Sequence, residues 1–209
     1  MEQWESSCNL RSFSCCTALP CESFLMEFTV SSFNVLADAY ARDRTFPYCD
    51  PAALKWQSRR NRVQTALRQL DADILGLQEV DHHRWFEKAL TGYGFFYSQR
   101  GDGSHRKPDG CMLCWKKSVF ELVAGTETRV DLNDVAAGRL GLVQRDRLIK
   151  HNVGQFILLK SRQYENHYVF IGNVHLFWNP AFMDVKLKQA GYMMRRMRDA
   201  LWGHTQRLF

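Results

Sequence analysis

The stretch DADILGLQEVD, residues 71–81, is the strongest guide to the architecture of this chain. Its centre, residues 73–79, has the apolar pattern of a short buried β-strand, yet this strand ends in Gln78 and Glu79. A buried carboxylate without a partner is costly, so Glu79 requires a cation, a metal ion or solvent. The carboxyl ends of strands are also where open α/β sheets bind ligands. Two interpretations follow: Glu79 is a metal ligand, or it has left the sheet and faces water.

Strands and helices alternate on both sides of this stretch. Alternating or continuous apolar runs predict further strands at 27–35, 95–100, 111–115, 119–130, 153–161 and 167–176. Apolar residues at helical spacing predict helices at 49–70, 84–90 and 183–201. The strands 111–115 and 119–130 are expected to form a hairpin, whereas 131–150 fits no single pattern. The chain is therefore expected to be an α/β protein with a mixed β-sheet and flanking helices.

Size, composition and charge are those of one globular domain with an anionic partner. The chain has 209 residues, of which 45% are hydrophobic and 24% are charged. No apolar run approaches the roughly 20 residues that cross a bilayer, so no membrane association is expected. The formal net charge of +6 suits a polyanion such as nucleic acid, because Lys and Arg gain affinity by displacing counterions from phosphates.

The N-terminal segment and the cysteines bear on the cellular compartment. Residues 1–26 are expected to be an irregular leader; they lack the basic and apolar regions of a secretory signal, and an organellar address is the weaker alternative. The seven cysteines include no pair of spaced CxxC units, which indicates free thiols in a reducing compartment, hence the cytoplasm. The CMLC stretch at 111–114 is not expected to bind zinc, because strand positions three apart point to opposite faces.

Two more predicted strands end in polar residues of the kind that catalytic sites use. Asn34 lies near the end of the first strand, and His175 closes the last strand with Asn173 on the same face. Each has an ordinary structural alternative, since amides satisfy backbone groups and a single histidine is often a core residue. The occurrence of such residues at three strand ends favours a shared site.

Six stretches of the chain follow one another in the order of a known family. They are SFNVLAD (32–38), YCDPAALKWQSRR (48–60), DADILGLQEVD (71–81), KPDGCMLCWK (107–116), HNVGQFILLK (151–160) and NVHLFWNPAFMDVKLKQ (173–189). Together they resemble the exonuclease–endonuclease–phosphatase superfamily. More narrowly, the chain is similar to the poly(A)-removing nucleases of the carbon-catabolite-repressor type, to which Angel and nocturnin are related. The resemblance spans about residues 29–200.

The resemblance implies both a fold and a chemistry. Residues 27–209 would form the first half of a two-sheet α/β/β/α sandwich. The activity would be magnesium-dependent 3′–5′ exoribonuclease hydrolysis of RNA, with the poly(A) tail as substrate. Glu79 would be the Mg²⁺ ligand, Asn34 would help to position the metal site, and His175 would contact the scissile phosphate. These three residues are the expected catalytic group, and Mg²⁺ is the expected cofactor.

The resemblance also assigns substrate-binding residues and raises an expectation of incompleteness. Asn173 would support the catalytic histidine, and Asn179 and Pro180 would shape the nucleotide pocket. The family's Gly-Asp-Phe-Asn and Ser-Asp-His segments have no counterpart before Phe209, so this chain is expected to be an N-terminal portion with weak or no hydrolysis alone. Two alternatives stay open: a non-catalytic half-domain that binds RNA or a protein partner of unknown kind, and a hydrolase of nucleotides or small phosphodiesters.

Overall fold

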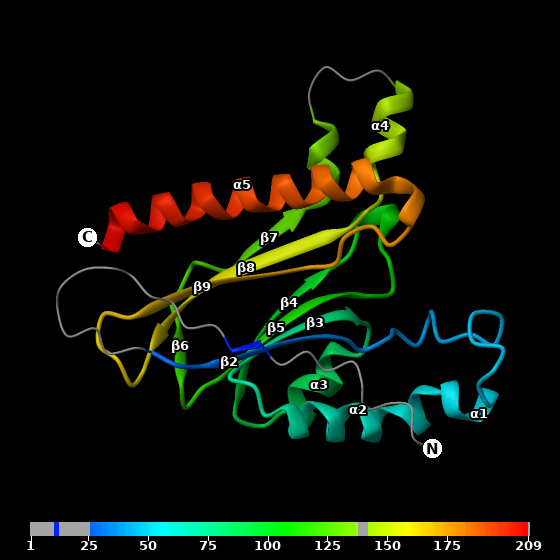
Figure 1. The fold of residues 1–209 in the computed structure, drawn as a ribbon, viewed down its shortest axis with the longest axis horizontal. Coiled ribbons are helices and arrows are strands. Elements are labelled where there is room, and N and C mark those ends of the chain that lie inside the picture. Colours follow the sequence, from blue (N-terminus) through cyan, green and yellow to red (C-terminus); the bar gives the residue numbers. More distant parts are fainter. Residues whose placement is uncertain (1–10, 13–25, 138–141, 209) are drawn as a thin grey trace.

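The structure, a computed structural model, describes residues 11–12, 26–137 and 142–208 (Figure 1). Most of the expected leader therefore lies outside the described residues. Its described part, Arg11–Ser12, forms strand β1, which pairs antiparallel with the strand Thr29–Asn34. Within the described ranges, no helix combines the length and the apolar character that crossing a membrane requires.

The first sheet has five strands in the order β1-β2-β3-β5-β4. Their bounds are Thr29–Asn34 for β2, Ile74–Val80 for β3, Tyr93–Gln99 for β4 and Gly110–Lys116 for β5. Strands β2 and β3 are parallel, with Asn34 opposite Gln78, and the other pairs are antiparallel. The parallel pairing brings the carboxyl ends of β2 and β3 to the same edge of the sheet.

The second sheet is built around the long strand β8, Val153–Ser161. Strand β9, Tyr168–Val174, pairs antiparallel with β8 along most of its length. The short strands β6, Phe120–Leu122, and β7, Thr128–Asp131, pair with opposite ends of β8. The expectation of an α/β protein with sheets and flanking helices is confirmed by this arrangement.

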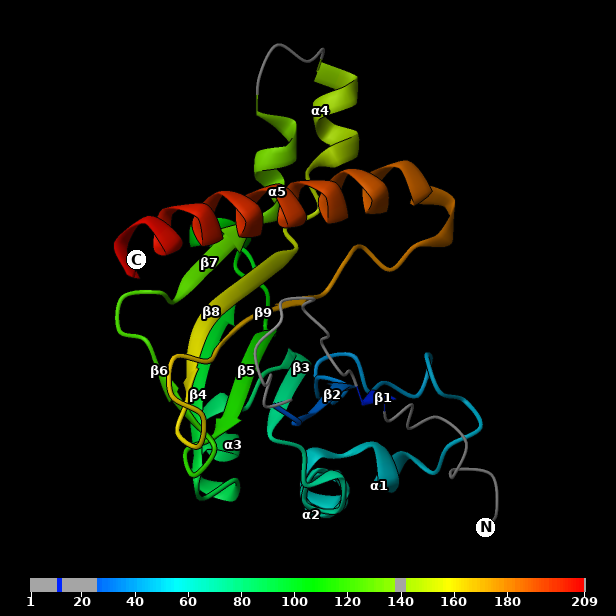
Figure 2. The ribbon, with the colours of Figure 1, turned by 60° about the vertical axis from the view of Figure 1, so that its left-hand side comes forward.

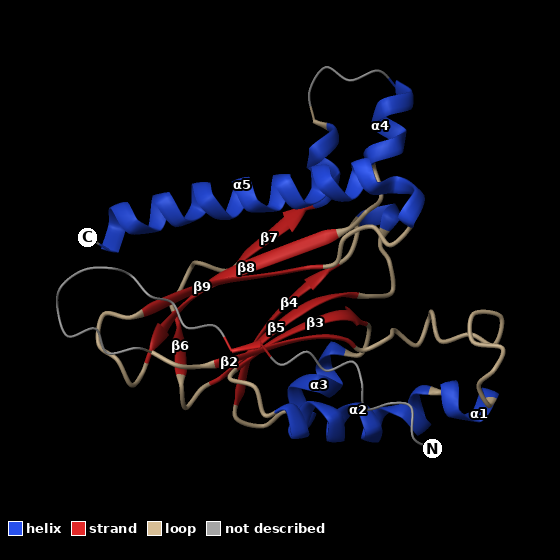
Figure 3. Ribbon diagram, viewed as in Figure 1, coloured by secondary structure: helices blue, strands red, loops and turns tan. Residues whose placement is uncertain are grey.

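The two sheets pack face to face, and helices cover their outer faces (Figures 1 and 2). The core between the sheets joins Ile74 and Leu113 to Ile157 and Leu159. Helices α2, Trp56–Leu70, and α3, His83–Ala89, cover the first sheet, whereas α5, Met183–Leu208, covers the second. The result is the four-layer α/β/β/α order (Figure 3).

Short elements complete the connections between these layers. They are the helices α1 (Pro51–Leu54) and α4 (Leu142–Leu148) and the 3-10 helices η1 (Gly103–His105), η2 (Leu132–Ala136) and η3 (Pro180–Phe182). The expected helix 49–70 is divided into α1 and α2, because Lys55 adopts an extended backbone. Asp50 caps α1 by accepting a hydrogen bond from the Ala52 amide at 2.9 Å.

The hairpin expected between 111–115 and 119–130 is wrong. Strand β5 lies in the first sheet and β6 in the second, so residues 117–119 carry the chain from one sheet to the other. The physical reason is that β3 and β4 occupy both edges of β5 and leave none for β6. The expected strand 119–130 also divides into β6 and β7, with Gly125 between them at a φ of 77°.

Candidate active site

Strand β3 delivers Glu79 to the site through an irregularity of its backbone. Along a regular strand Glu79 would share a face with Leu77, which is fully buried in the core under α2 and α3. The pairing of β3 with β5 shifts register between Leu77 and Val80, and Glu79 itself adopts a φ of 57°. Bulges of this kind re-aim side chains and are common next to active sites. The carboxylate therefore leaves the core, and its side chain is 15% exposed.

Asn34 and the loop after β2 hold the Glu79 carboxylate from one side. The Asn34 Nδ2 donates to Glu79 Oε1 at 2.8 Å, and the Ala37 amide donates to Oε2 at 3.2 Å. The Asn34 Oδ1 in turn accepts from the Leu36 amide at 2.9 Å. Because both carboxylate oxygens accept a hydrogen bond from a fixed donor, the orientation of Glu79 is set by the protein.

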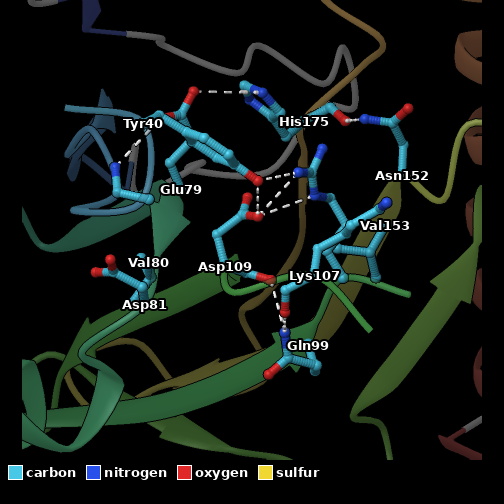
Figure 4. A network of polar contacts seen from close by, with 12 residues as sticks. Tyr40, Glu79, Val80, Asp81, Gln99, Lys107, Asp109, Asn152, Val153 and His175 are labelled. Atoms are coloured by element: carbon cyan, nitrogen blue, oxygen red, sulfur yellow. Dashed lines mark hydrogen bonds and ion pairs between the residues drawn. The ribbon is translucent and has the colours of Figure 1, made fainter. Parts of the chain in front are cut away.

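His175, the first residue after β9, faces the same carboxylate across the gap between the two sheets. Its Nε2 lies 3.7 Å from Glu79 Oε1, and Figure 4 shows the two side chains directed toward each other. Burial lowers the pKa of His175 below its ordinary value, although the neighbouring Glu79 carboxylate opposes this shift. The imidazole is therefore neutral at pH 7 and can donate one hydrogen bond and accept another. The structure thus brings Asn34, Glu79 and His175 together.

Two residues that sequence reasoning missed, Asn152 and Gln189, support the backbone of His175. Asn152 donates through Nδ2 to the His175 carbonyl at 3.0 Å (Figure 4). Gln189, fully buried on α5, donates to Asn152 Oδ1 at 3.3 Å and accepts from the Phe177 amide at 2.9 Å. A signal existed in the sequence, because Gln189 stands four residues from both Val185 and Met193, which form the buried face of α5. The apolar residues Leu187, Met194 and Leu201 lie instead on the exposed face.

A second missed feature is a cluster of the half-buried Tyr40 and Arg100 around the buried Asp109. Tyr40 Oη donates to Asp109 Oδ1 at 2.6 Å, and Arg100 Nε donates to the same oxygen at 3.0 Å. Arg100 also donates to Tyr40 Oη. Burial raises the pKa of Tyr40, so the phenol stays protonated. Figure 4 shows Tyr40 and Asp109 beside Glu79 and His175, where the cluster closes one flank of the site.

Asn173, an expected substrate-binding residue, lies in the core beneath the site. Only 5% of the residue is exposed. Its Nδ2 donates to the carbonyls of Leu77 at 2.8 Å and Met112 at 3.1 Å, and its Oδ1 accepts from Gln78 Nε2 at 2.7 Å. These bonds tie β9 to the first sheet. A contact of Asn173 with substrate stays a prediction.

Asn179 and Pro180 lie in the connection between β9 and α5. Asn179 Oδ1 caps η3 by accepting from the Ala181 amide at 2.9 Å, and Pro180 occupies the first turn of η3. Within the part of the chain that the structure describes, no hydrogen bond or ion pair joins either residue to Asn34, Glu79 or His175. Their expected contact with a nucleotide likewise stays a prediction.

The donor set around Glu79 fits one class of metal ion. No three His, Cys, Asp or Glu side chains cluster in a metal-binding arrangement among the described residues. Zinc and calcium sites need four or more ligands, mostly from protein, whereas Mg²⁺ keeps several waters and takes one or two carboxylates. Glu79, with one hydrogen bond on each oxygen and further lone pairs available, suits the second case. The thiols of Cys111 and Cys114 are buried and form no disulfide bond.

A pocket of about 490 Å³ opens at the ends of β3 and β4. Its lining residues are Asp81, His83, Tyr97, Gln99, Arg106, Lys107 and Pro108. His83 stacks on Tyr97 with ring centroids 4.3 Å apart, and Arg106 and Lys107 contribute positive charge. The pocket therefore combines an aromatic wall with two cations, and Asp81, which also lines it, stands two residues after Glu79 in the chain.

Comparison with known proteins agrees with this geometry. A family model described as the Endonuclease/Exonuclease/phosphatase family matches residues 31–183, a range that includes Asn34, Glu79 and His175. The chain is 32% identical to carbon catabolite repressor protein 4 homolog 4 of Arabidopsis thaliana, with coverage of 82% of this chain and 47% of that protein. It is 30% identical to the CCR4-Not complex 3′-5′-exoribonuclease subunit Ccr4 of Phaeosphaeria nodorum, with coverage of 79% and 30%.

Solved structures give the same result at the level of the fold. The structure of ANGEL2, a 2′,3′-cyclic phosphatase, in complex with adenosine-2′,3′-vanadate superposes with a TM-score of 0.63 at 29% identity. The match covers 78% of this chain and 45% of that one. The chain thus spans about half the length, or less, of these relatives.

Proposed function

Because the chain belongs to the endonuclease/exonuclease/phosphatase family, we propose that it hydrolyses phosphodiester bonds of RNA as a magnesium-dependent 3′–5′ exoribonuclease, with poly(A) as substrate. The observation that carries this proposal is the convergence of Asn34, Glu79 and His175 at one edge of the two sheets. All three lie within the residues that the family model matches. Relatives at about 30% identity include a named 3′-5′-exoribonuclease, which supports the choice of reaction.

Each side chain of the site would have its own role in the reaction. Glu79 would hold Mg²⁺, which when bound supplies charge neutralisation at the phosphate. Asn34 and the Ala37 amide keep the carboxylate oriented toward that position. His175, neutral at pH 7 because burial lowers its pKa, donates a hydrogen bond to a phosphate oxygen. Asn152 holds the backbone of His175 so that the imidazole faces Glu79.

The charge and the pocket support RNA as the substrate class. The chain carries a formal net charge of +6, and Arg106 and Lys107 line the pocket at the ends of β3 and β4. Cations that track the RNA backbone supply affinity, and aromatic surfaces stack on bases. A cytoplasmic site of action is part of the proposal, since Cys49, Cys111 and Cys114 are free thiols and a reducing compartment maintains that state.

We expect slow turnover from the 209-residue chain alone. Among the described residues, Glu79 is the one carboxylate that forms an ion-pair contact with His175, and catalytic groups that act as a unit lose most of their effect when some are absent. Cation binding is therefore the first measurement, because it does not require turnover. Titration with Mn²⁺ or Mg²⁺ by calorimetry should show binding that Glu79→Gln weakens by roughly 100-fold, whereas Glu87→Gln, on the exposed side of α3, should bind as the wild type does.

The activity test uses poly(A) labelled at its 5′ end with Mg²⁺ present. The expected product series shortens from the 3′ end, and it disappears with EDTA and with Glu79→Gln. Equal cleavage by the wild type and Glu79→Gln would contradict the assignment of the site. Cation binding that is unaffected by Glu79→Gln would contradict the assignment of the metal ligand.

A second candidate function is hydrolysis of a 2′,3′-cyclic phosphate. It is favoured by the 29% identity to ANGEL2, whose structure is described as that of a 2′,3′-cyclic phosphatase. Adenosine 2′,3′-cyclic phosphate offered beside poly(A) separates the two candidates. Ring opening without shortening of poly(A) would favour the phosphatase, and the reverse would favour the exoribonuclease.

A further inference from the structure

A buried guanidinium outside the site, that of Arg59 on α2, points toward the loop that follows β2. Its side chain is only 12% exposed. Arg59 Nη1 donates to the carbonyls of Val35 at 3.3 Å and Leu36 at 2.9 Å, and Nε donates to the Leu54 carbonyl at 2.9 Å. One rigid fork thus fixes two consecutive peptide groups of the loop and ties them to the end of α1.

The loop that Arg59 holds has a backbone conformation that needs such support. Leu36 adopts a φ of 57°, in the left-handed region that L-residues other than glycine, asparagine and aspartate rarely occupy. Conformations of this kind persist only where the surroundings determine them, and they are frequent at functional sites. The two carbonyls bound by Arg59 belong to Leu36 and to the residue before it.

The same loop carries the donors that orient Glu79. The Leu36 amide donates to Asn34 Oδ1, and the Nδ2 of the same Asn34 side chain donates to Glu79 Oε1. The Ala37 amide donates to Glu79 Oε2. Displacement of the Leu36 turn would move both donors at once. Arg59 is therefore linked to Glu79 indirectly, through the Leu36 turn. Among the described contacts it makes no hydrogen bond to the Glu79 carboxylate.

We propose that Arg59 is a positioning residue for Glu79: its Nη1, bound to the Val35 and Leu36 carbonyls while Nε is anchored on the Leu54 carbonyl, holds the turn that sets the orientation of the carboxylate. The expected effect on metal affinity rests on the proposed function. The expected effect on hydrogen exchange in the Leu36 turn does not depend on any metal. Lysine cannot replace arginine here, because a single ammonium cannot bind the Leu54 carbonyl and the two loop carbonyls in the way that Nε and Nη1 of the planar guanidinium do. The conservative variant is thus the informative one.

The experiment compares Arg59→Lys and Arg59→Met with Arg62→Lys and Arg62→Met, matched controls at an exposed position of the same helix. Hydrogen exchange of the Ala37 amide, measured by NMR, reports the turn; exchange of Leu113 and Ile157 reports the core. In both Arg59 variants we expect Ala37 to exchange roughly 10-fold faster or more, as for a lost hydrogen bond to a charged group. The core amides and the Arg62 variants should match the wild type. Mn²⁺ affinity should fall roughly 10- to 100-fold.

The outcomes separate this proposal from the proposed function. Unchanged Ala37 exchange in Arg59→Lys would overturn the positioning role, and so would acceleration of Ala37 and the core by the same factor, which marks a general loss of stability. Faster Ala37 exchange with full Mn²⁺ affinity, in a protein whose binding Glu79→Gln abolishes, would also overturn it. If Glu79→Gln leaves Mn²⁺ binding intact, the metal assignment fails, and the exchange data alone decide whether Arg59 controls the turn.

Discussion

Gln78 and Asn173 join the two sheets through a 2.7 Å hydrogen bond, one residue along the chain from Glu79. Asn173 also donates to the carbonyls of Leu77 and Met112, so one amide from β9 serves two strands of the first sheet. Buried polar groups stabilise a fold only while every partner is satisfied. The polar link between the sheets therefore supports both the fold and the site above it.

Asn173→Leu should destabilise the protein although it is close in size to the original residue. Each buried group left without a partner costs roughly 1–3 kcal/mol, and this substitution removes the Asn173 donor from the carbonyls of Leu77 and Met112. Gln78 Nε2 loses one acceptor but keeps its bonds to Ser32 Oγ and the Gly76 carbonyl. We expect the free energy of unfolding, measured in urea, to fall by at least about 2 kcal/mol. Asn61→Ala, at an exposed position of α2, is the control and should stay within about 0.5 kcal/mol. A small effect of Asn173→Leu would show that the link is dispensable.

Gly76→Ala should also destabilise the protein, because the new methyl group would press on the side-chain amide of Asn173. A Cβ at residue 76 would lie 3.3 Å from both Cγ and Oδ1 of Asn173, which its hydrogen bonds prevent from retreating. We expect a loss of roughly 1–3 kcal/mol, typical of an overpacked core, in urea unfolding. Gly203→Ala on α5 meets no atom within 4 Å and should be neutral or stabilising. Equal stabilities of the two variants would contradict the tight approach at Gly76.

Stability should fall as the pH is lowered, and His151 should contribute to that fall. Burial, followed by the charges of His105 and Lys107, lowers the pKa of His151 below its ordinary value of 6.5. The unfolded chain therefore takes up this proton first, so the stabilisation is complete above pH 6.5 and is lost as the pH falls through the folded-state pKa. The ring accepts at Nδ1 from Asn133 Nδ2 at 3.1 Å, a bond that protonation at that atom removes.

Urea unfolding between pH 7.5 and 5 tests this expectation with His151→Asn as the comparison. Asparagine tolerates the φ of 56° at this position, so the variant removes the titrating ring with little backbone penalty. The variant should lose less stability on acidification than the wild type. Parallel curves for the two proteins would contradict the prediction.

Cys111 and Cys114 should resist alkylation in the native protein. Burial raises the pKa of Cys111 to about 12 and that of Cys114 even further, so almost no thiolate exists at pH 8. Iodoacetamide followed by mass spectrometry should find both unmodified without denaturant and fully modified in urea. Cys49, which is half-buried, should react before either of them. Modification of Cys114 at the rate of Cys49 would contradict the burial of β5.

Much of the architecture follows from local pattern, and the exceptions have tertiary causes. The apolar run at 153–161 corresponds to the bounds of β8, because a strand buried on both faces leaves a continuous signal. The hairpin after β5 failed because the occupancy of a strand's edges is a property of the whole sheet. The division of the expected helix at Lys55 likewise involves a distant contact, because the Trp56 amide at the start of α2 donates to Asp38 Oδ1 in the loop after β2.

The candidate site likewise combines residues that local pattern predicted with contacts that it did not predict. Three polar strand ends pointed to Asn34, Glu79 and His175, and the structure brings these residues together. The register shift that turns Glu79 out of the core, and the bond from Asn152 to the His175 carbonyl, could not be predicted, because they arise between elements far apart in the sequence. Gln189 did leave a signal, as a polar residue on the apolar face of α5. Buried polar residues within apolar patterns are the signal that a sequence gives for such supports.

The left-handed backbone at Leu36 and at Glu79 lowers the stability of the fold, because each position carries a side chain in a conformation that favours glycine. Glycine would adopt either conformation without the steric penalty of a side chain. Selection for thermal tolerance alone, in a laboratory screen or in a gene released from its original role, should therefore enrich glycine at both positions. At position 79 the same change removes the carboxylate, so a variant selected there for heat resistance would lose the proposed metal ligand, whereas glycine at position 36 would leave the carboxylate in place.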